Sequence, residues 1–216
     1  MLGAVPAAGA EDPLEPANRK IFAFNDTVDR WVLRPVASGY DRVTPQPVQR
    51  GIGNFFENLG TPVVALNQVL QGKPKRGLGD FTRFLVNSTI GIGGLFDIAG
   101  RNGLPRHSED FGQTLAVWTG GQGPFLTIPF RGPATTTHAV GMVLQGFASP
   151  LRLISPQRDR MIILAVDLID TRADLLSTDR MVSGDRYLFI RDAYLQNREY
   201  QINDGQVECD PFLDDC

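Results

Sequence analysis

The sequence predicts an all-α protein, and two observations support this prediction. Apolar residues recur at steps of three and four along most of the chain, which is the spacing of one face of an α-helix. A strand-like pattern occurs only in FLTIPF at 125–130, where Pro129 permits no more than an edge strand or an extended segment. Frequent Gly and Pro residues divide the helical pattern, so we expect many short helices in one domain.

The composition argues against some partners and topologies. A net charge of −3 and a pI near 5.4 provide no general basic field, so nucleic acid is not an expected partner. No apolar run approaches the length of about 18 residues that an ordinary single membrane span needs. The 13 Phe residues, against 4 Tyr and 2 Trp, suit either a large core or a lipid-facing surface, because the Phe ring has no polar group.

The chain divides into three parts. Residues 1–11 have no Lys or Arg and no hydrophobic signal region, so they predict a disordered lead-in without an intact signal peptide. Residues 12–203 are expected to form a single helical domain, and 204–216 an acidic, mobile tail. Cys209 and Cys216 in this tail are a candidate disulfide for an oxidising compartment. A metal site there is disfavoured, because no CxxC spacing and no nearby His accompany them.

Three amphipathic helices are expected before the central stretch of the chain. The first covers 14–31, where apolar positions step by three and four, and Pro35 is expected to end it. A short helix follows at 48–59. Thr61-Pro62 is typical of an N-cap followed by the first helical position, so a separate helix is expected from there to Gly72.

The second half of the chain is expected to continue as a polar loop at 101–110 and four further helices. The helices are expected at 109–118, from Pro133 to about Phe147, from Ser155-Pro156 to about Leu176, and from Asp185 to about Gln201.

The stretch from Phe81 to Gly100 is the centre of this organisation. As a single helix it would be about 30 Å long, the thickness of the hydrocarbon core of a bilayer. One face would be apolar, formed by Phe81, Phe84, Leu85, Ile92 and Leu95. A second face would be polar or small, formed by Arg83, Asn87, Gly91 and Gly94. The charged, amide and Gly residues offset the favourable insertion of the apolar ones, so the segment is too polar to span a bilayer alone.

No catalytic constellation is found in the sequence. There is no GxSxG motif, and GIGNFF, GLGDFT and GIGGLF each lack the third Gly of a dinucleotide-binding turn. His107 and His138 lie far apart and belong to no HExxH motif. An enzyme is therefore not expected, and neither is a cofactor or a metal.

A family resemblance is based on eight segments in the same order along the chain. They are DPLEPANRKIFAFND at 12–26, RPVASGY at 34–40, NFFENLGTP at 54–62, LNQVLQG at 66–72, DFTRFLVNSTIGIGGLFDIAG at 80–100, EDFGQTLAVWTGGQGPFLTIPFRGP at 109–133, TRADLL at 171–176 and RDAYLQNREY at 191–200. Together they span nearly the whole chain, and they resemble the MlaA/VacJ family of outer-membrane lipoproteins.

The resemblance implies a ring-shaped assembly of amphipathic helices around a central amphipathic channel, lying in the outer-membrane bilayer. Phospholipids misplaced in the outer leaflet would leave through this channel toward the periplasm. The implied partners are outer-membrane phospholipids, a trimeric porin and a soluble periplasmic lipid-carrier protein. The implied location is the outer membrane, entered from the periplasmic side and normally with a lipid anchor.

The resemblance gives the two faces of the central stretch a context. The face with Arg83, Asn87, Gly91 and Gly94 is expected to line or shape the lipid channel, or to pack against a close helix neighbour, which is the usual role of a small-residue stripe. The face with Phe81 is expected to meet lipid or the core. Residues 101–110 are the expected position of the hairpin that the family carries beside its channel.

Two features depart from the family pattern. The lipobox Cys that begins these lipoproteins is absent, and ATTTHAVG stands where an Arg-Asp pair usually follows the GP at 132–133. A structural, porin-associated scaffold without a lipid path is the alternative function. A continuous opening lined by polar and apolar groups would distinguish the channel from this scaffold.

Overall fold

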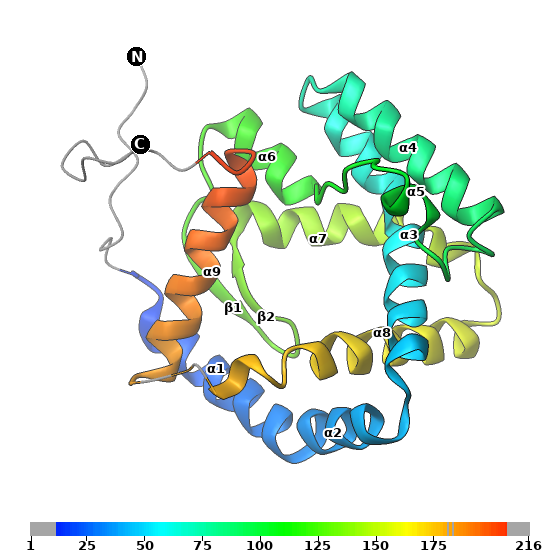
Figure 1. Ribbon diagram of the computed structural model, residues 1–216. Helices are drawn as coiled ribbons and strands as arrows, with labels where there is room; N and C mark the ends of the chain where they lie inside the picture. Colours follow the sequence, from blue (N-terminus) through cyan, green and yellow to red (C-terminus); the bar gives the residue numbers. More distant parts are fainter. Residues whose placement is uncertain (1–11, 181, 183, 207–216) are drawn as a thin grey trace, which may run out of the picture.

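The chain folds into a ring of helices, as the computed structural model shows for residues 12–180, 182 and 184–206 (Figure 1). Its α-helices are α1 (Glu15–Val28), α2 (Arg34–Val43), α3 (Gln46–Leu70), α4 (Pro74–Thr89), α5 (Ile98–Arg101), α6 (Phe111–Thr119), α7 (Thr136–Ala148), α8 (Gln157–Asp174) and α9 (Arg186–Ile202). A π-helical turn, η1 (Asp29–Leu33), and two 3₁₀ turns, η2 (Pro150–Leu153) and η3 (Thr178–Arg180), connect them. Strands β1 (Phe125–Ile128) and β2 (Gly132–Thr135) form an antiparallel hairpin.

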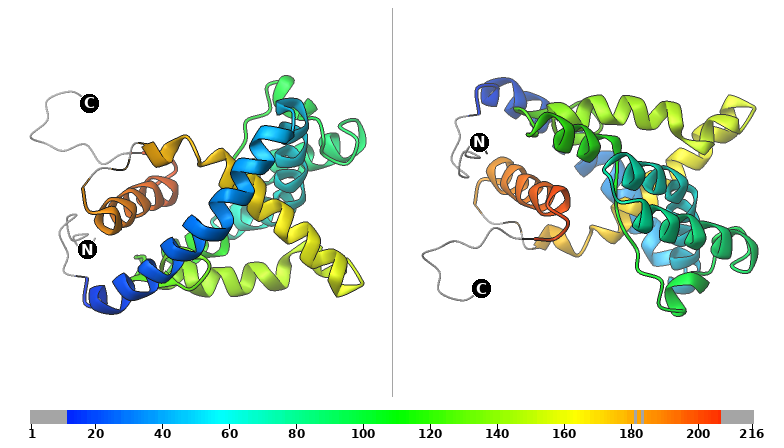
Figure 2. Two further views of the ribbon diagram at one scale, coloured as in Figure 1. Left: turned by 90° about the horizontal axis from the view of Figure 1, so that it is seen from below. Right: turned by 90° about the horizontal axis from the view of Figure 1, so that it is seen from above.

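The order of the helices around the ring follows from their contacts. In Figure 1, α1 and α2 form the lower side, α3 the right side, α6 and α7 the upper side and α9 the left side, while α8 crosses α3. Helix α4 packs along α3 and lies outside the ring. Figure 2 shows that the α4–α5 turn and the α7–α8 turn diverge on opposite sides of α3. The predicted mostly helical, ring-shaped fold is confirmed.

The ring closes where α1 meets the hairpin and α9. The Asn18 side chain, which is 2% exposed, donates to the Phe125 carbonyl at 3.2 Å and accepts from the Thr127 N–H at 2.8 Å. Arg19 pairs with Asp185 at the start of α9, at 2.9 Å. The Asn18 contacts satisfy backbone groups that the short β1 strand would otherwise bury without partners.

Two predicted helix ends are wrong, and both were placed at a proline. Pro35 does not end the first helix, because the Arg34 N–H bonds the Asp29 carbonyl in a π-turn and Pro35 then occupies the first turn of α2. Pro62 does not begin a new helix, since α3 runs through it as one element of 25 residues. An internal proline costs about 3 kcal/mol, and the long packed interface of α3 with α4 offsets that cost.

The prediction of one helix from Phe81 to Gly100 is also wrong. Helix α4 ends at Thr89, and a tight turn follows in which Gly93 and Gly94 have φ values of 68° and 94°. The Gly94 N–H bonds the Asn87 carbonyl at 2.8 Å, which satisfies the end of α4. Glycine permits this left-handed backbone, so the residues that extended the helical spacing in the sequence instead terminate the helix.

The hairpin and the polar loop lie at different places in the chain. Residues 104–110 form the expected loop without regular structure, but the antiparallel hairpin is formed by β1 and β2. The strand-like pattern at 125–130 is therefore confirmed as a strand, while 101–110 contains no hairpin. Pro133 lies in β2, so the following helix begins at Thr136 rather than at Pro133.

The distribution of polar and apolar side chains is inverted relative to a water-soluble domain. The largest fully buried side chains are all polar: Gln68, Gln113, Asn67, Thr114, Thr135 and Asp80. Large apolar side chains on every side of the ring are exposed instead, among them Trp31 at 76%, Val43 at 79% and Phe147 at 67%. Soluble proteins bury such residues and expose polar ones, so this surface is suited to a less polar solvent than water.

Candidate functional site

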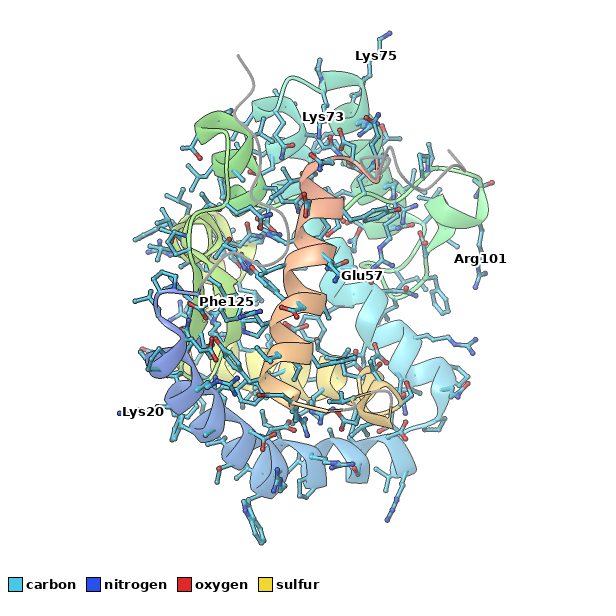
Figure 3. All side chains as sticks on the ribbon, turned by 90° about the vertical axis from the view of Figure 1, so that its left-hand side faces the viewer. Lys20, Glu57, Lys73, Lys75, Arg101 and Phe125 are labelled. Atoms are coloured by element: carbon cyan, nitrogen blue, oxygen red, sulfur yellow. The ribbon has the colours of Figure 1, made fainter. Side chains whose placement is uncertain are left out.

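Two adjoining cavities lie where α3 crosses α8. The first cavity, of about 310 Å³, lies between α3, α7, η2 and α8. The second, of about 340 Å³, lies along the first half of α3. Gly53, Glu57 and Asp174 line both cavities. Figure 3 shows Glu57 about midway along α3. The lining of the first cavity mixes carboxylates with apolar groups such as Phe56 and Leu151, so it is amphipathic.

The carboxylates of the first cavity come from one face of α8 and from α3. Asp167, Asp170 and Asp174 follow one another at helical spacing on α8, and Glu57 faces them from α3. Burial raises the pKa of Asp167, and the nearby Asp170 raises it further. Burial also raises the pKa of Asp170, against the hydrogen bond that it accepts from the Tyr40 hydroxyl at 2.5 Å. These four carboxylates form an acidic wall in which Asp170 is buried and Asp167 is half-buried, whereas Glu57 and Asp174 are exposed.

A third cavity, of about 200 Å³, lies between α3, α4 and the loop at 106–108. Arg83 and Asn87 line it, and both bind Asp97, at 3.1 and 2.9 Å. His107 pairs with the buried Asp80 at 3.0 Å in the same cavity. Two of the four predicted channel residues therefore lie in a packed polar network outside the inner face of the ring.

The two glycines predicted to accompany them pack closely and line none of these cavities. A Cβ at Gly91 would lie 2.3 Å from the Phe96 carbonyl oxygen, and a Cβ at Gly94 would lie 2.5 Å from the Asn58 Cβ. The lack of a side chain at Gly94 lets this turn approach α3, whereas Gly91 permits close contacts within the turn that ends α4. The contact of Gly94 with α3 is of the kind expected for close packing against a neighbouring helix.

The predicted apolar face of the central stretch lies on the surface. Phe81, Leu85, Ile92 and Leu95 are 41–64% exposed, and Phe84 is partly exposed. On α4 the opposite face is buried and polar, with Asp80, Arg83 and Asn87. This apolar face is therefore not part of the core, and it faces the surroundings of the protein.

The acidic wall was not predicted from the sequence, although a signal for it was present. The spacing of Asp167, Asp170 and Asp174 places three carboxylates on one face of α8, while Met161, Leu164 and Leu168 lie on another. Only the apolar face was recognised. Glu57 could not be assigned to the same wall, since it lies more than 100 residues away in the sequence and meets α8 only in the folded chain.

Partly buried ion pairs join helices around the ring. Arg198 on α9 binds Asp110 through two hydrogen bonds of 2.6 and 2.7 Å, and its side chain is 5% exposed. Arg172 on α8 binds Asp29 at 2.6 Å and Asp179 at 2.8 Å. Pairs of this kind join elements that are far apart in the sequence, so they determine the geometry of the ring.

The tail begins with a fixed residue rather than a mobile one. Asp204 pairs with Lys73 at 2.7 Å and with Arg76 at 2.8 Å, which ties the end of α9 to the start of α4 (Figure 3). Lys73 also contacts Glu109 at 3.4 Å. The lead-in at 1–11, most of the predicted tail and the candidate disulfide Cys209–Cys216 lie outside the described residues.

The Asp110–Arg198 pair predicts a loss of stability in acid. Burial opposes ionisation of Asp110, but hydrogen bonds from Arg198 and from the Gln113 N–H outweigh it, so the pKa of Asp110 lies below its usual value. A depressed pKa contributes stability that is fully present above the unfolded value of about 3.9 and is lost as the pH falls through the folded value. We expect the thermal midpoint to fall between pH 5 and pH 3.

The Asp110→Asn variant is the control for this pH dependence. Asn retains the N-cap of α6 but does not titrate, so the midpoint of the variant should fall less between pH 5 and pH 3. Thermal scans by circular dichroism in mild detergent measure the difference. Equal falls for the two proteins would contradict the assignment.

Among the described residues, no helix is long and apolar enough to cross a bilayer by itself. Likewise, over residues 12–180, 182 and 184–206 no three His, Cys, Asp or Glu side chains are grouped to hold a metal ion.

Known proteins are similar to this chain in sequence, and a solved structure is similar to it in fold. A family model described as "MlaA lipoprotein" matches residues 10–201. The intermembrane phospholipid transport system lipoprotein MlaA of Escherichia coli is 37% identical over 207 residues, which cover 93% of this chain and 82% of the relative. Its namesake from Haemophilus influenzae is 30% identical, over 91% of this chain and 81% of that protein. An uncharacterized protein of Rickettsia felis is 37% identical, over 88% and 78%.

A solved structure gives the same result for the fold. That chain, from work on the structural basis for maintenance of bacterial outer membrane lipid asymmetry, superposes with a TM-score of 0.79 at 36% identity. The match covers 89% of this chain and all of the solved one. Sequence and fold therefore agree over most of the molecule, and the chain belongs to the MlaA lipoprotein family.

Proposed function

We propose that this protein lies in the outer membrane and removes phospholipids from its outer leaflet through the centre of the helical ring. The relatives named for intermembrane phospholipid transport, and the solved structure concerned with lipid asymmetry, support a role in that process. The geometry described above supports the mechanism. Catalysis forms no part of the proposal.

The observation that carries the proposal is the inverted surface of the ring. Val140, Val143, Leu144 and Phe147 form one face of α7, and each is at least 39% exposed. Each buried methylene group is worth about 0.8 kcal/mol when it leaves water, so an exposed apolar face of this kind favours the acyl chains of a bilayer. The polar interior then faces other helices and the inner cavities.

The two faces of α8 show how one helix can serve both environments. Met161, Leu164 and Leu168 are 40–57% exposed, whereas Asp167, Asp170 and Asp174 line the 310 Å³ cavity. A phospholipid headgroup crosses hydrocarbon only at a large cost in desolvation, which a wall of polar groups lowers. The apolar part of the same wall, including Phe56 and Leu151, can accompany the acyl chains.

The lipid is proposed to leave for a soluble periplasmic carrier, with the ring seated beside a trimeric porin and held by a lipid anchor. A porin-associated scaffold would have the same apolar perimeter. It would not need an amphipathic inner wall, and the cavities where α3 crosses α8 favour the conduit for that reason.

Complementation tests the proposal directly. In a Gram-negative strain without its own family member, this chain behind a lipoprotein signal is expected to lower the phospholipid exposed at the cell surface. The exposed phospholipid can be measured with a phospholipase added outside the cells. An unchanged amount, with the protein present in the outer membrane, would contradict the proposal.

The apolar perimeter makes a separate prediction about membrane binding. A Lys residue costs up to about 3 kcal/mol at the centre of a bilayer, and less near the interface. The double variant Val140→Lys/Val143→Lys should therefore partition into vesicles at least tenfold less than the unchanged protein, as measured by flotation.

Two polar positions on α9 provide the matched control. Gln196 and Asn197 are exposed and already polar, so Gln196→Lys/Asn197→Lys adds the same charge without removing apolar surface. This control should bind vesicles as the unchanged protein does. Equal weakening in both variants would show that the effect comes from charge alone and not from the apolar face.

A further inference from the structure

The charge of the 310 Å³ cavity is one-sided. Four carboxylates line it, those of Glu57, Asp167, Asp170 and Asp174, and none of its lining residues is Lys, Arg or His. In the adjoining cavity the one cationic lining residue is Arg50, whose guanidinium donates to Gln46 at 3.2 Å. Carboxylates that share a space without a cation repel one another, and a positively charged group entering it would relieve that repulsion.

Most of these carboxylates have no cationic partner within the described part of the chain. Glu57 pairs with Arg106, but Asp167 and Asp174 take part in no ion pair among the described residues. Neither of these two carboxylates accepts a hydrogen bond from a described residue. They are therefore available to a positively charged ligand.

One further acceptor in the same cavity lacks a donor, and it does not belong to the four carboxylates. The Oε1 atom of Gln145, which also lines the cavity, is buried and has no hydrogen-bond partner. Buried acceptors without donors are uncommon, so the cavity suits a ligand that brings N–H donors. An ammonium group has three.

We propose that the inner wall prefers phospholipids whose headgroup carries an ammonium group, such as phosphatidylethanolamine, over anionic ones such as phosphatidylglycerol. This inference rests on the proposed lipid path and adds a substrate preference to it. The ammonium group meets Asp167, Asp170 and Asp174 as the lipid passes, while the acyl chains follow Phe56 and Leu151. An anionic headgroup has no such partner and is repelled by the same carboxylates.

The expected preference follows from the interaction of single charges. One ammonium–carboxylate contact at about 4 Å in water changes an equilibrium by about fivefold, and more where water is partly excluded. We therefore expect the protein to retain phosphatidylethanolamine at least about fivefold better than phosphatidylglycerol with the same acyl chains.

A competition between two lipids tests this preference. The purified full chain in mild detergent is incubated with equal amounts of the two lipids, with EDTA to remove divalent cations, and the retained lipids are measured by mass spectrometry. The variant Asp167→Asn/Asp174→Asn keeps the shape of the wall and removes two charges. Its ratio of retained lipids should move toward one by about fivefold or more.

Asp159→Asn is the matched control. Asp159 is exposed on the first turn of the same helix and lines none of the cavities, so its loss should leave the ratio unchanged. Equal retention of both lipids by the unchanged protein, or a ratio that Asp167→Asn/Asp174→Asn does not alter, would overturn the preference and leave the conduit standing. Retention of neither lipid would overturn both.

Discussion

Replacing Gly60 with tryptophan is expected to stop the removal of outer-leaflet phospholipid while the protein still folds. Gly60 lies on α3 and lines both the 310 Å³ cavity and the polar cavity beside α4. A Cβ at this position would meet nothing within 4 Å, so the first atom of a new side chain fits without displacing a neighbour. The indole ring would then occupy space that a passing lipid needs.

The expected effect is the largest that a single substitution allows. Exposed phospholipid in cells that carry Gly60→Trp should rise to the amount found in cells without the protein, as measured with external phospholipase. A helical Gly is less favourable than most residues by up to about 1 kcal/mol, so the substitution should not reduce helix stability by itself. Normal amounts of the variant in the outer membrane, with an unchanged thermal midpoint, would establish that it folds.

Gly79→Trp is the matched control for this block. Gly79 lies within α4, a Cβ there also meets nothing within 4 Å, and it lines none of the three cavities. This variant should clear phospholipid normally. Normal clearance by Gly60→Trp as well would favour the scaffold over the conduit. Gly91 and Gly94 do not suit the test, since a side chain there would clash with the backbone or with Asn58 and disturb the fold.

Removing the Arg198 guanidinium is expected to destabilise the ring more than any surface substitution. Its side chain is 5% exposed and makes two hydrogen bonds to Asp110, and it also donates to Gln201 at 3.1 Å. Arg198→Met keeps most of the apolar stem but leaves the Asp110 carboxylate without its cation. Breaking a buried pair in this way costs about 3–5 kcal/mol.

The thermal midpoint reports this loss. In a chain of about this size, 1 kcal/mol corresponds to roughly 2–4 °C, so Arg198→Met should lower the midpoint by on the order of 10 °C. The same variant should lose most of the acid sensitivity that the Asp110 pair produces, because the pKa of Asp110 is no longer lowered by Arg198.

An exposed pair provides the comparison. Arg30 binds Asp26 at 2.7 Å one helical turn away, but its side chain is 61% exposed. Exposed pairs of this kind contribute at most about 1 kcal/mol, so Arg30→Met should lower the midpoint by only a few degrees. Similar losses in the two variants would show that burial of the Arg198 pair does not matter in the way proposed.

The sequence by itself determined the class of the fold and the family. Helical spacing is a local property, because residues three or four apart meet on the same face whatever surrounds the helix. It therefore identified most helices correctly and predicted that Phe81 and Leu85, one turn apart on α4, share an apolar face. Motifs in a fixed order along nearly the whole chain were sufficient to identify the family.

The ends of the helices were harder to predict, because the same residue type is compatible with two different backbone structures at these positions. Pro62 is compatible with a first helical position and also with the interior of a helix that packs over its whole length. Gly91 and Gly94 fit the helical spacing of α4, yet the backbone turns at this point and they approach Asn87 and Asn58. Packing against α3 decided both cases, and packing is not visible in a window of about ten residues.

Only the tertiary structure decided which residues form the acidic wall and which pairs close the ring. Tyr40 and Asp170 are 130 residues apart, and Asp110 and Arg198 are 88 apart, yet each pair shares a hydrogen bond of 2.5 to 2.7 Å. Nothing local to either member specifies its partner. The partner is selected when the helices close into a ring, since only then must each buried charge find the opposite charge or the donor that compensates it.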